Sequence, residues 1–426
     1  MLLDEKNISC LRQEKEILNE TIEMTQDDAI YIGANPTQFS TKEVKGEEIT
    51  RNGQTFYKIS NADGMRPFFM SIVSNSDHWM FISSNGSLSA GRKNSDYALF
   101  PYYTDDKITE AAETTGSKSI FIVTKSGKKH LWEPFSVRQN GMYHTTRNLY
   151  KNTYGNKIVF EEINHDLALT FTYEWNSSEK FGFVRKACIS NNGAERISVN
   201  VLDGIQNILP YGVEPALQSA SSNLVDAYKK CELEEDSGVG IYSLSAIIVD
   251  KAEPSEALKA NVVWSLGLDN AKKLISSLQL DDFRRGHGVM QEVDIRAEKG
   301  AYFLNDEITL QPDASESWML VANVNQTMSD IVQIKEKLQN HTALQETILA
   351  DIEAGSNHLV ALVAAADGLQ MTNDRLRNIR HFANTMFNIM RGGIFDDNYH
   401  IEKADFTTYI ANANRKVYRL KEAILA

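Results

Sequence analysis

Hydrophobic and polar residues alternate with a period of two through much of the region from about residue 40 to residue 325. The clearest stretch is 167–175, in which every second residue is large and apolar: Leu167, Leu169, Phe171, Tyr173 and Trp175. Such alternation places one face of a strand on a core and the other toward solvent or a second layer. Turn signals such as Asn52-Gly53 and Asn140-Gly141 recur between these stretches. The pattern predicts an antiparallel β-sandwich, and the absence of a repeat of fixed period argues against a propeller.

The period becomes helical at both ends of the chain. Residues 4–28 predict a short amphipathic helix, and residues after 326 predict several more. Gly355 and Gly368 are expected to interrupt these later helices, and one helix is predicted inside the β region at 271–280. We therefore expect three parts: a helical extension at 1–35, a β-rich domain at 36–325 and a helical region at 326–426.

Composition and net charge exclude several classes of function. The chain has 426 residues, of which 42% are hydrophobic and 24% charged, with a net charge of −13. A uniformly acidic protein lacks the basic face that nucleic acid requires. The charged amino terminus has no apolar signal-peptide core, and no run approaches the roughly 18 apolar residues of a membrane span. The most apolar run, 359–366, predicts only a short helix. We expect a cytoplasmic protein with no membrane partner, and the three scattered cysteines are expected to be reduced.

Aromatic and polar residues are densest between residues 61 and 106. Aromatic faces cover the apolar C–H surfaces of sugars, while Asn, Asp, Arg and His bond to their hydroxyl groups. This mixture indicates carbohydrate binding. The alternative is that the aromatic residues of this region are core residues: Trp79, Phe81, Tyr97 and Phe100.

Several motifs of this region support a family resemblance. Gly86 is followed by Ala90-Gly91-Arg92-Lys93-Asn94-Ser95 and by Leu99-Phe100-Pro101-Tyr102. This run resembles the amino-terminal domain of cellobiose and chitobiose phosphorylases, the inverting disaccharide phosphorylases of glycoside hydrolase family 94. Further similar segments are Trp132-Glu133-Pro134, 143–147 and 183–192, so that the resemblance covers about residues 55–325. The sequence departs from the family at Tyr102, where the family has Trp, and in the inserted-looking segment 209–237.

The resemblance implies a galactose-mutarotase-like antiparallel β-supersandwich followed by a helical linker. In the family an (α/α)6 barrel comes next and carries the general-acid Asp and the phosphate site. The stretch 326–426 is too short for twelve helices of about 12 residues each, so we expect the linker and at most the start of a barrel. The resemblance therefore implies a non-catalytic carbohydrate-binding or structural module that lacks the catalytic barrel. The sequence has no HExxH motif and no tight His/Asp cluster, so we expect no metal, and we expect no cofactor.

The same resemblance suggests partners and a binding rim. The expected partners are an oligosaccharide or sugar phosphate, the missing barrel and a second copy of the chain. The residues expected near the sugar site are Arg92, Asn94, Asp96, Tyr102 and His78.

Other polar groups of the sequence could form chemical sites. The pairs Asp105-Asp106 and Glu161-Glu162 are expected in turns or in solvent, and neighbours on a strand point to opposite faces. Arg284-Arg285-Gly286-His287-Gly288 is expected to be a solvated loop rather than an anion site. The arginines of 375–391 are expected to face the acidic sandwich, and the apolar stripe of 382–390 needs a covering layer.

Two alternative functions stay open. A stand-alone aldose-1-epimerase-like enzyme would use a His/Glu pair chosen from the β region: His144, His165 and His287 with Glu133, Glu162 and Glu292. A ligand-free assembly module would instead dimerise through 375–425.

Overall fold

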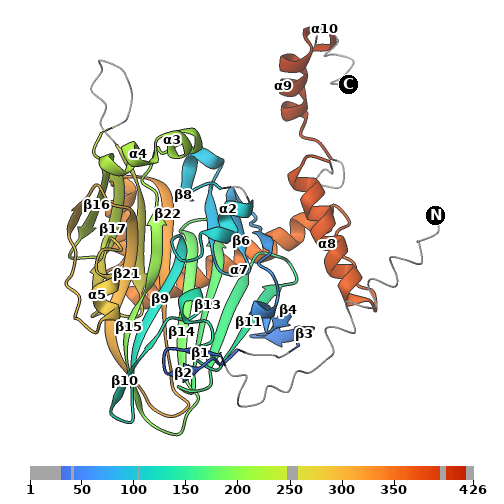
Figure 1. Ribbon diagram of the computed structural model, residues 1–426. Coiled ribbons are helices and arrows are strands. Elements are labelled where there is room, and N and C mark those ends of the chain that lie inside the picture. Colours follow the sequence, from blue (N-terminus) through green and yellow to red (C-terminus); the bar gives the residue numbers. More distant parts are fainter. Residues whose placement is uncertain (1–29, 40–42, 104, 247–257, 394–399, 419–426) are drawn as a thin grey trace.

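The computed structural model describes residues 30–39, 43–103, 105–246, 258–393 and 400–418. Two antiparallel sheets dominate it (Figure 1). The larger has eleven strands, in the order β20 (Asp294–Arg296), β16 (Lys229–Glu234), β17 (Val239–Leu244), β18 (Lys259–Leu266), β22 (Ser315–Thr327), β14 (Gly182–Asn191), β13 (Leu169–Ser178), β12 (Ile158–Asn164), β11 (Thr145–Asn152), β4 (Gln54–Ser60) and β3 (Lys45–Arg51). The smaller has five, in the order β10 (Lys128–Trp132), β9 (Gly116–Lys125), β15 (Ile197–Ile208), β21 (Gly300–Leu310) and β19 (Lys272–Leu274).

The alternation in the sequence explains how the two sheets pack. On β13, Leu169, Phe171 and Tyr173 are buried and the residues between them are partly exposed. Phe171 meets Phe121 of β9 edge to face, with ring centroids 4.9 Å apart, so the inner faces of the two sheets share one core. The predicted fold, an antiparallel β-supersandwich followed by a helical carboxy-terminal part, is confirmed.

A fully buried ion pair crosses this core. Arg185 on β14 donates from Nη1 to Oδ2 of Asp203 on β15 at 2.6 Å, and from Nη2 to Oδ1 at 2.9 Å. The same carboxylate accepts from Trp318 Nε1 at 2.7 Å and from Ser119 Oγ at 2.6 Å. Because these donors come from both sheets, the carboxylate fixes how one sheet is placed over the other.

A four-stranded sheet extends the sandwich beside α2 (Asp105–Glu110). Its strands are β5 (Phe69–Ile72), β6 (His78–Ser83), β7 (Leu88–Arg92) and β8 (Ala98–Phe100). The inner face of this small sheet joins the main core through residues such as Met80, Ile82 and Phe100. The outer face of this small sheet points away from the main core.

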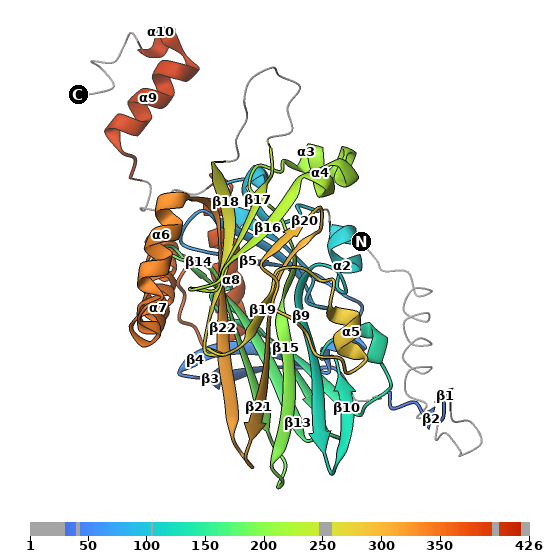
Figure 2. The same cartoon turned by 90° about the vertical axis from the view of Figure 1, so that its left-hand side faces the viewer.

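Two helices cover the outer face of the eleven-stranded sheet, as Figure 2 shows: α6 (Met328–Lys337) and α7 (His341–Ala365). Thr327 and Asp330 form a capping box at the start of α6. On α7, Leu344, Ile348 and Ile352 pack in one cluster with Trp264 and other sheet residues. Among the described helices α7 alone is long and apolar enough to span a membrane by length and composition, and in this fold it covers the sheet.

The structure corrects several predictions about helices. Gly355 does not interrupt a helix, and the run 359–366 is not a separate short one, because both lie within or at the end of α7. The predicted helix at 271–280 is also wrong. Lys272–Leu274 form strand β19, Leu274 and Ile275 enter the core, and the helix α5 (Leu280–Arg284) begins only at the end of the range.

The remaining described elements are short or peripheral. β1 (Tyr31–Ile32) and β2 (Asn35–Pro36) form a hairpin, so the expected extension at 1–35 ends in β structure. The predicted helix at 4–28 lies outside the described residues. Helices α3 (Pro215–Ala220) and α4 (Ser222–Tyr228) occupy the inserted-looking segment. After α7 come α8 (Arg375–Met390), α9 (Lys403–Ala413) and α10 (Arg415–Tyr418), with Gly368 in the break before α8 as predicted.

Candidate functional site

An aromatic strip lies on the outer face of the small sheet. Along β6 the side chains alternate, so that Met80 and Ile82 point into the core while Trp79 and Phe81 stay partly exposed. Phe69 stacks on Phe81 with centroids 5.4 Å apart, and the Trp79 ring lies 5.9 Å from that of Phe81. Tyr102 meets Trp79 edge to face at 5.5 Å and is 45% exposed. We call Phe69, Trp79, Phe81 and Tyr102 the aromatic strip.

The loop after β7 places polar groups at the end of this strip. Asn94 Oδ1 accepts from the backbone N–H of Asp96 at 3.0 Å and caps the short 3-10 turn 95–97. The carbonyl oxygen of Asn94 accepts from Trp79 Nε1 at 3.1 Å. Asn94 and Asp96 are both exposed. The loop therefore holds the indole in place and leaves a carboxylate and an amide beside it.

Gly91 explains how Trp79 lies so close to the sheet. A Cβ at Gly91 would be 2.5 Å from the indole ring of Trp79 and 2.4 Å from the carbonyl oxygen of Tyr97. The indole therefore lies directly over the backbone of β7, where only a glycine leaves room.

His78 is not an exposed rim residue. It is 8% exposed, its Nδ1 lies 2.8 Å from Ser76 Oγ, and its ring packs edge to face on Phe183. Burial, assisted by the charge of Arg92, lowers the pKa of His78 to about 3. The imidazole is therefore neutral at ordinary pH and acts as a packed polar group beneath the strip.

Arg92 lies opposite His78 on the neighbouring strand β7. Its Nε donates to Asp77 Oδ1 at 2.8 Å and its Nη1 to Asn323 Oδ1 of β22 at 3.3 Å. The guanidinium thus ties the small sheet to the large one. Of the five residues predicted for the sugar site, Asn94, Asp96 and Tyr102 lie exposed around Trp79, whereas His78 and Arg92 are held by other side chains. The alternative of a purely structural role is correct for Phe100, which is fully buried.

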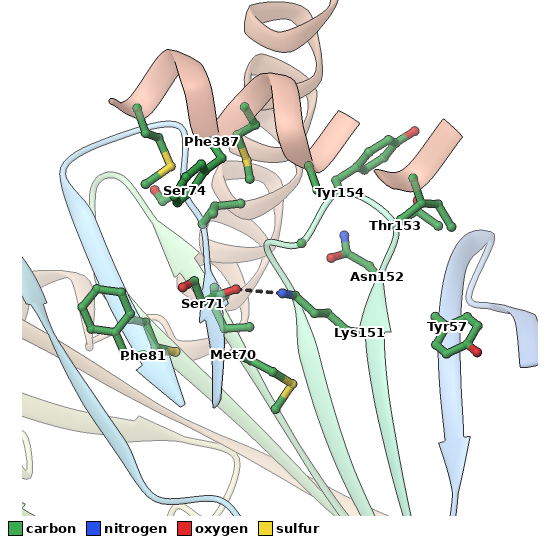
Figure 3. A pocket seen from close by; sticks show the side chains of 18 of the residues that line it. Tyr57, Met70, Ser71, Ser74, Phe81, Lys151, Asn152, Thr153, Tyr154 and Phe387 are labelled. Atoms are coloured by element: carbon green, nitrogen blue, oxygen red, sulfur yellow. Dashed lines mark hydrogen bonds between the residues drawn. The ribbon is translucent and has the colours of Figure 1, made fainter. Parts of the chain in front are cut away.

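A long cavity adjoins the strip. It has a volume of about 820 Å³ and lies between α8, the strands β5 and β6 and the turn from β11 to β12 (Figure 3). We call this space the α8 groove. Its walls are largely apolar, and they include Trp79 and Phe81 of the strip, together with Met386, Phe387 and Met390 of α8. The sequence indicated the apolar stripe of α8 but not the cavity, because nothing in the local pattern reveals how far a helix stands from a sheet.

The stripe predicted at 382–390 is only partly covered. Phe382 is buried, and its ring centroid lies 5.3 Å from that of Tyr154. Phe387 and Met390 stay more than half exposed. The prediction for the nearby arginines is confirmed for Arg375, which pairs with Glu48 of β3. Arg377 instead pairs with Asp374 of its own helix, and Arg391 lies over the ring of Phe387.

The paired carboxylates have different environments. Glu161 and Glu162 point to opposite faces of β12 as predicted, but Glu162 is buried rather than in solvent. It accepts from Trp132 Nε1 at 2.8 Å and from Arg147 Nε at 2.7 Å. Another element covers this face of β12, so Glu162 does not reach solvent. Two adjacent glutamates in a sequence do not reveal such a cover. Asp105 and Asp106 begin helix α2.

The three glutamates considered for epimerase chemistry are bound by groups other than the candidate histidines in the contacts that the described residues show. Glu292 accepts from the backbone N–H groups of Ile275 and Ser276. His144 stacks near His165, with ring centroids 4.9 Å apart, and His287 lies 3.7 Å from Asp282. Each carboxylate candidate is held by other donors.

Glu133 belongs to a buried charge cluster at the edge of the five-stranded sheet. Arg284 donates from Nε to Glu133 Oε1 at 2.8 Å and from Nη2 to Glu133 Oε2 at 3.0 Å. Lys118 Nζ lies 2.9 Å from the same Oε2. Arg284 is therefore committed to this cluster and not free to bind an anion. Arg285 and His287, from the same Arg-Arg-Gly-His-Gly stretch, are exposed, in agreement with the predicted solvated loop.

Comparisons with known proteins give one short family match. Residues 395–426 match glycoside hydrolase family 149 insertion domain 1. No curated protein matches the sequence.

Several solved structures are similar to the chain. A bacterial glucoamylase complexed with acarbose is 9% identical, with a TM-score of 0.42, over 82% of this chain and 43% of that one. A protein described as a kojibiose phosphorylase from the human microbiome is 10% identical, with a TM-score of 0.39, over 80% and 43%. An Escherichia coli K12 protein described as an aldose 1-epimerase is 9% identical, with a TM-score of 0.31, over 61% and 99%. The chain thus spans less than half the length of the first two.

Proposed function

We propose that this chain is a carbohydrate-binding part of a protein of glycoside hydrolase or phosphorylase type, and that it binds an oligosaccharide through the aromatic strip. The observation that carries the proposal is the pair of the partly exposed Trp79 and the exposed Tyr102, with the loop of Asn94 and Asp96 next to it. A sugar ring would lie on the aromatic faces while the amide and the carboxylate bond to its hydroxyl groups.

The match of residues 395–426 to a family 149 insertion domain supports the carbohydrate-active part of this proposal. The finer assignment to family 94, the missing barrel, the cytoplasmic location and the homodimer stay predictions. In keeping with the family resemblance, we propose that this chain binds sugar without cleaving it.

Replacing Trp79 by Ala should weaken oligosaccharide binding about tenfold or more, because a stacked aromatic face is removed. Tyr102→Ala should have a smaller effect in the same direction. A glycan array would identify the ligand, and titration calorimetry would then give the affinity of each variant.

Tyr31→Ala is the matched control, since Tyr31 is an exposed tyrosine on the β1–β2 hairpin. Its affinity should equal that of the unmodified protein. Equal affinities for the unmodified protein and a folded Trp79→Ala variant would refute the assignment of the sugar site to the strip.

A further inference from the structure

The α8 groove has the form of a ligand site rather than of a packing defect. Its volume of about 820 Å³ falls within the roughly 300–1,000 Å³ typical of small-molecule pockets. Its apolar walls come from elements far apart in sequence, among them Met70 on β5, Leu149 on β11 and Ile379 on α8. An apolar ligand in this groove would be stabilised by dispersion contacts with these walls.

One cationic group lies at the floor of the groove. Lys151, at the end of β11, extends between β11 and β5, and its Nζ donates to the carbonyl oxygen of Ser71 at 2.8 Å (Figure 3). No carboxylate among the described residues lies within ion-pair distance of this amine. Burial lowers the pKa of Lys151 to about 8, and no carboxylate opposes that effect. The ammonium form is thus held in an apolar site without a counter-charge.

A second cation belongs to the same groove. Arg380 is an exposed residue of α8 that lines the groove, and no described residue is within ion-pair distance of its guanidinium. In a protein of net charge −13, two unpaired cations in one apolar groove are a local excess of positive charge. The groove therefore complements a molecule with an apolar body and a negative group.

We propose that the α8 groove binds a long-chain carboxylate of the fatty-acid type, with its acyl chain along α8 and its carboxylate at Lys151. Arg380 supplies the second positive charge. Methionines of the lining, among them Met70, Met386 and Met390, contribute flexible thioether side chains that adapt to an unbranched chain. The groove shares Trp79 and Phe81 with the aromatic strip, but Lys151 and Arg380 are outside the strip, so this proposal goes beyond carbohydrate binding and is tested separately.

The test uses dodecanoate below its micelle-forming concentration, with dodecanol as a probe of the same chain length but without charge. Titration calorimetry on the full chain should show dodecanoate binding at least tenfold more tightly than dodecanol. Lys151→Met should remove most of that difference by weakening dodecanoate about tenfold, with dodecanol unchanged. Arg380→Met should act in the same direction and replaces an exposed residue, so that it tests the proposal even if Lys151→Met does not fold.

The pH dependence provides a second readout. The groups around Lys151 are Tyr57 on β4, Tyr154 after β11, His78 on β6 and Arg380 on α8. The lowered pKa of His78 keeps its imidazole neutral between pH 7 and pH 9. Dodecanoate affinity should therefore fall between pH 7 and pH 9 in the unmodified protein as Lys151 loses its proton, and stay level in Lys151→Met.

Lys129→Met is the matched control, because Lys129 is exposed on β10, and it should bind dodecanoate as the unmodified protein does. The proposal is overturned if neither probe binds, or if dodecanoate and dodecanol bind equally in all variants. It also fails if folded Lys151→Met and Arg380→Met variants keep full dodecanoate affinity. Oligosaccharide binding measured in the same variants should be unchanged, which separates this result from the proposal for the aromatic strip.

Discussion

Replacing Asp203 by Ala should lower the free energy of unfolding by about 3–5 kcal/mol, the largest loss that we expect from one substitution. The carboxylate is fully buried and accepts four hydrogen bonds, from Arg185, Trp318 and Ser119. Its removal leaves the Arg185 guanidinium buried, with the hydrogen bond to Ser117 Oγ and the contact with the Tyr173 ring but without its counter-charge. An uncompensated charge in a low-dielectric core is the main cost.

Urea unfolding followed by circular dichroism would measure this loss. Asp236→Ala is the control, because Asp236 is exposed in the turn between β16 and β17, and it should change stability by no more than about 0.5 kcal/mol. If Asp203→Ala costs less than about 1 kcal/mol, the carboxylate does not join the two sheets in the way described.

Replacing Glu133 by Ala should cost about 3 kcal/mol. Glu133 is 3% exposed and faces both Lys118 and Arg284, so the substitution leaves two cations at the edge of the five-stranded sheet with less negative charge. Glu113, at 2.7 Å from Lys118, keeps that lysine partly compensated. This second acid makes the expected loss smaller than that for Asp203.

The pH dependence of stability gives a sharper test of the same cluster. Burial alone would raise the pKa of Glu133, but the hydrogen bonds from Arg284 and the charge of Lys118 outweigh it, so the pKa lies below its ordinary value. A lowered pKa in the folded state contributes stability above the pKa of the unfolded chain, and this is lost as pH falls through the folded pKa.

Glu133→Gln should therefore have a shallower decline in unfolding free energy than the unmodified protein between about pH 5 and pH 3. Glu298→Gln, at an exposed glutamate, should have the same slope as the unmodified protein. Parallel slopes for all three proteins would show that Glu133 is not stabilised by its cationic neighbours.

The sequence predicts the sandwich well because strand periodicity is local and strong. The alternation at 167–175 corresponds to a strand from Leu169 to Ser178 whose apolar side chains enter the core. At 271–280 the helical spacing of Leu274, Ile275 and Leu278 predicts a helix. In the fold Leu274 and Ile275 enter the core at the end of a short strand, and Leu278 is exposed. Tertiary contacts therefore override the local helical spacing.

The sequence predicts only part of the candidate site, because the rest depends on contacts between residues that are distant along the chain. Composition indicates the region of the aromatic strip, and the family resemblance points to Asn94 and Tyr102. The burial of His78 depends on Phe183, which is distant in sequence. The α8 groove likewise depends on the separation between α8 and the strands β5 and β11, and Lys151 is unusual only because the fold encloses it.

The most direct measurement of the central claim follows binding and turnover on one sample. The purified chain is incubated with a panel of oligosaccharides, with and without inorganic phosphate. Affinity electrophoresis detects retention by sugar, and chromatography detects released sugar or sugar phosphate. The account predicts retention that Trp79→Ala abolishes, and no released product in either condition. Release of sugar or sugar phosphate by the isolated chain, or a complete lack of retention, would contradict it.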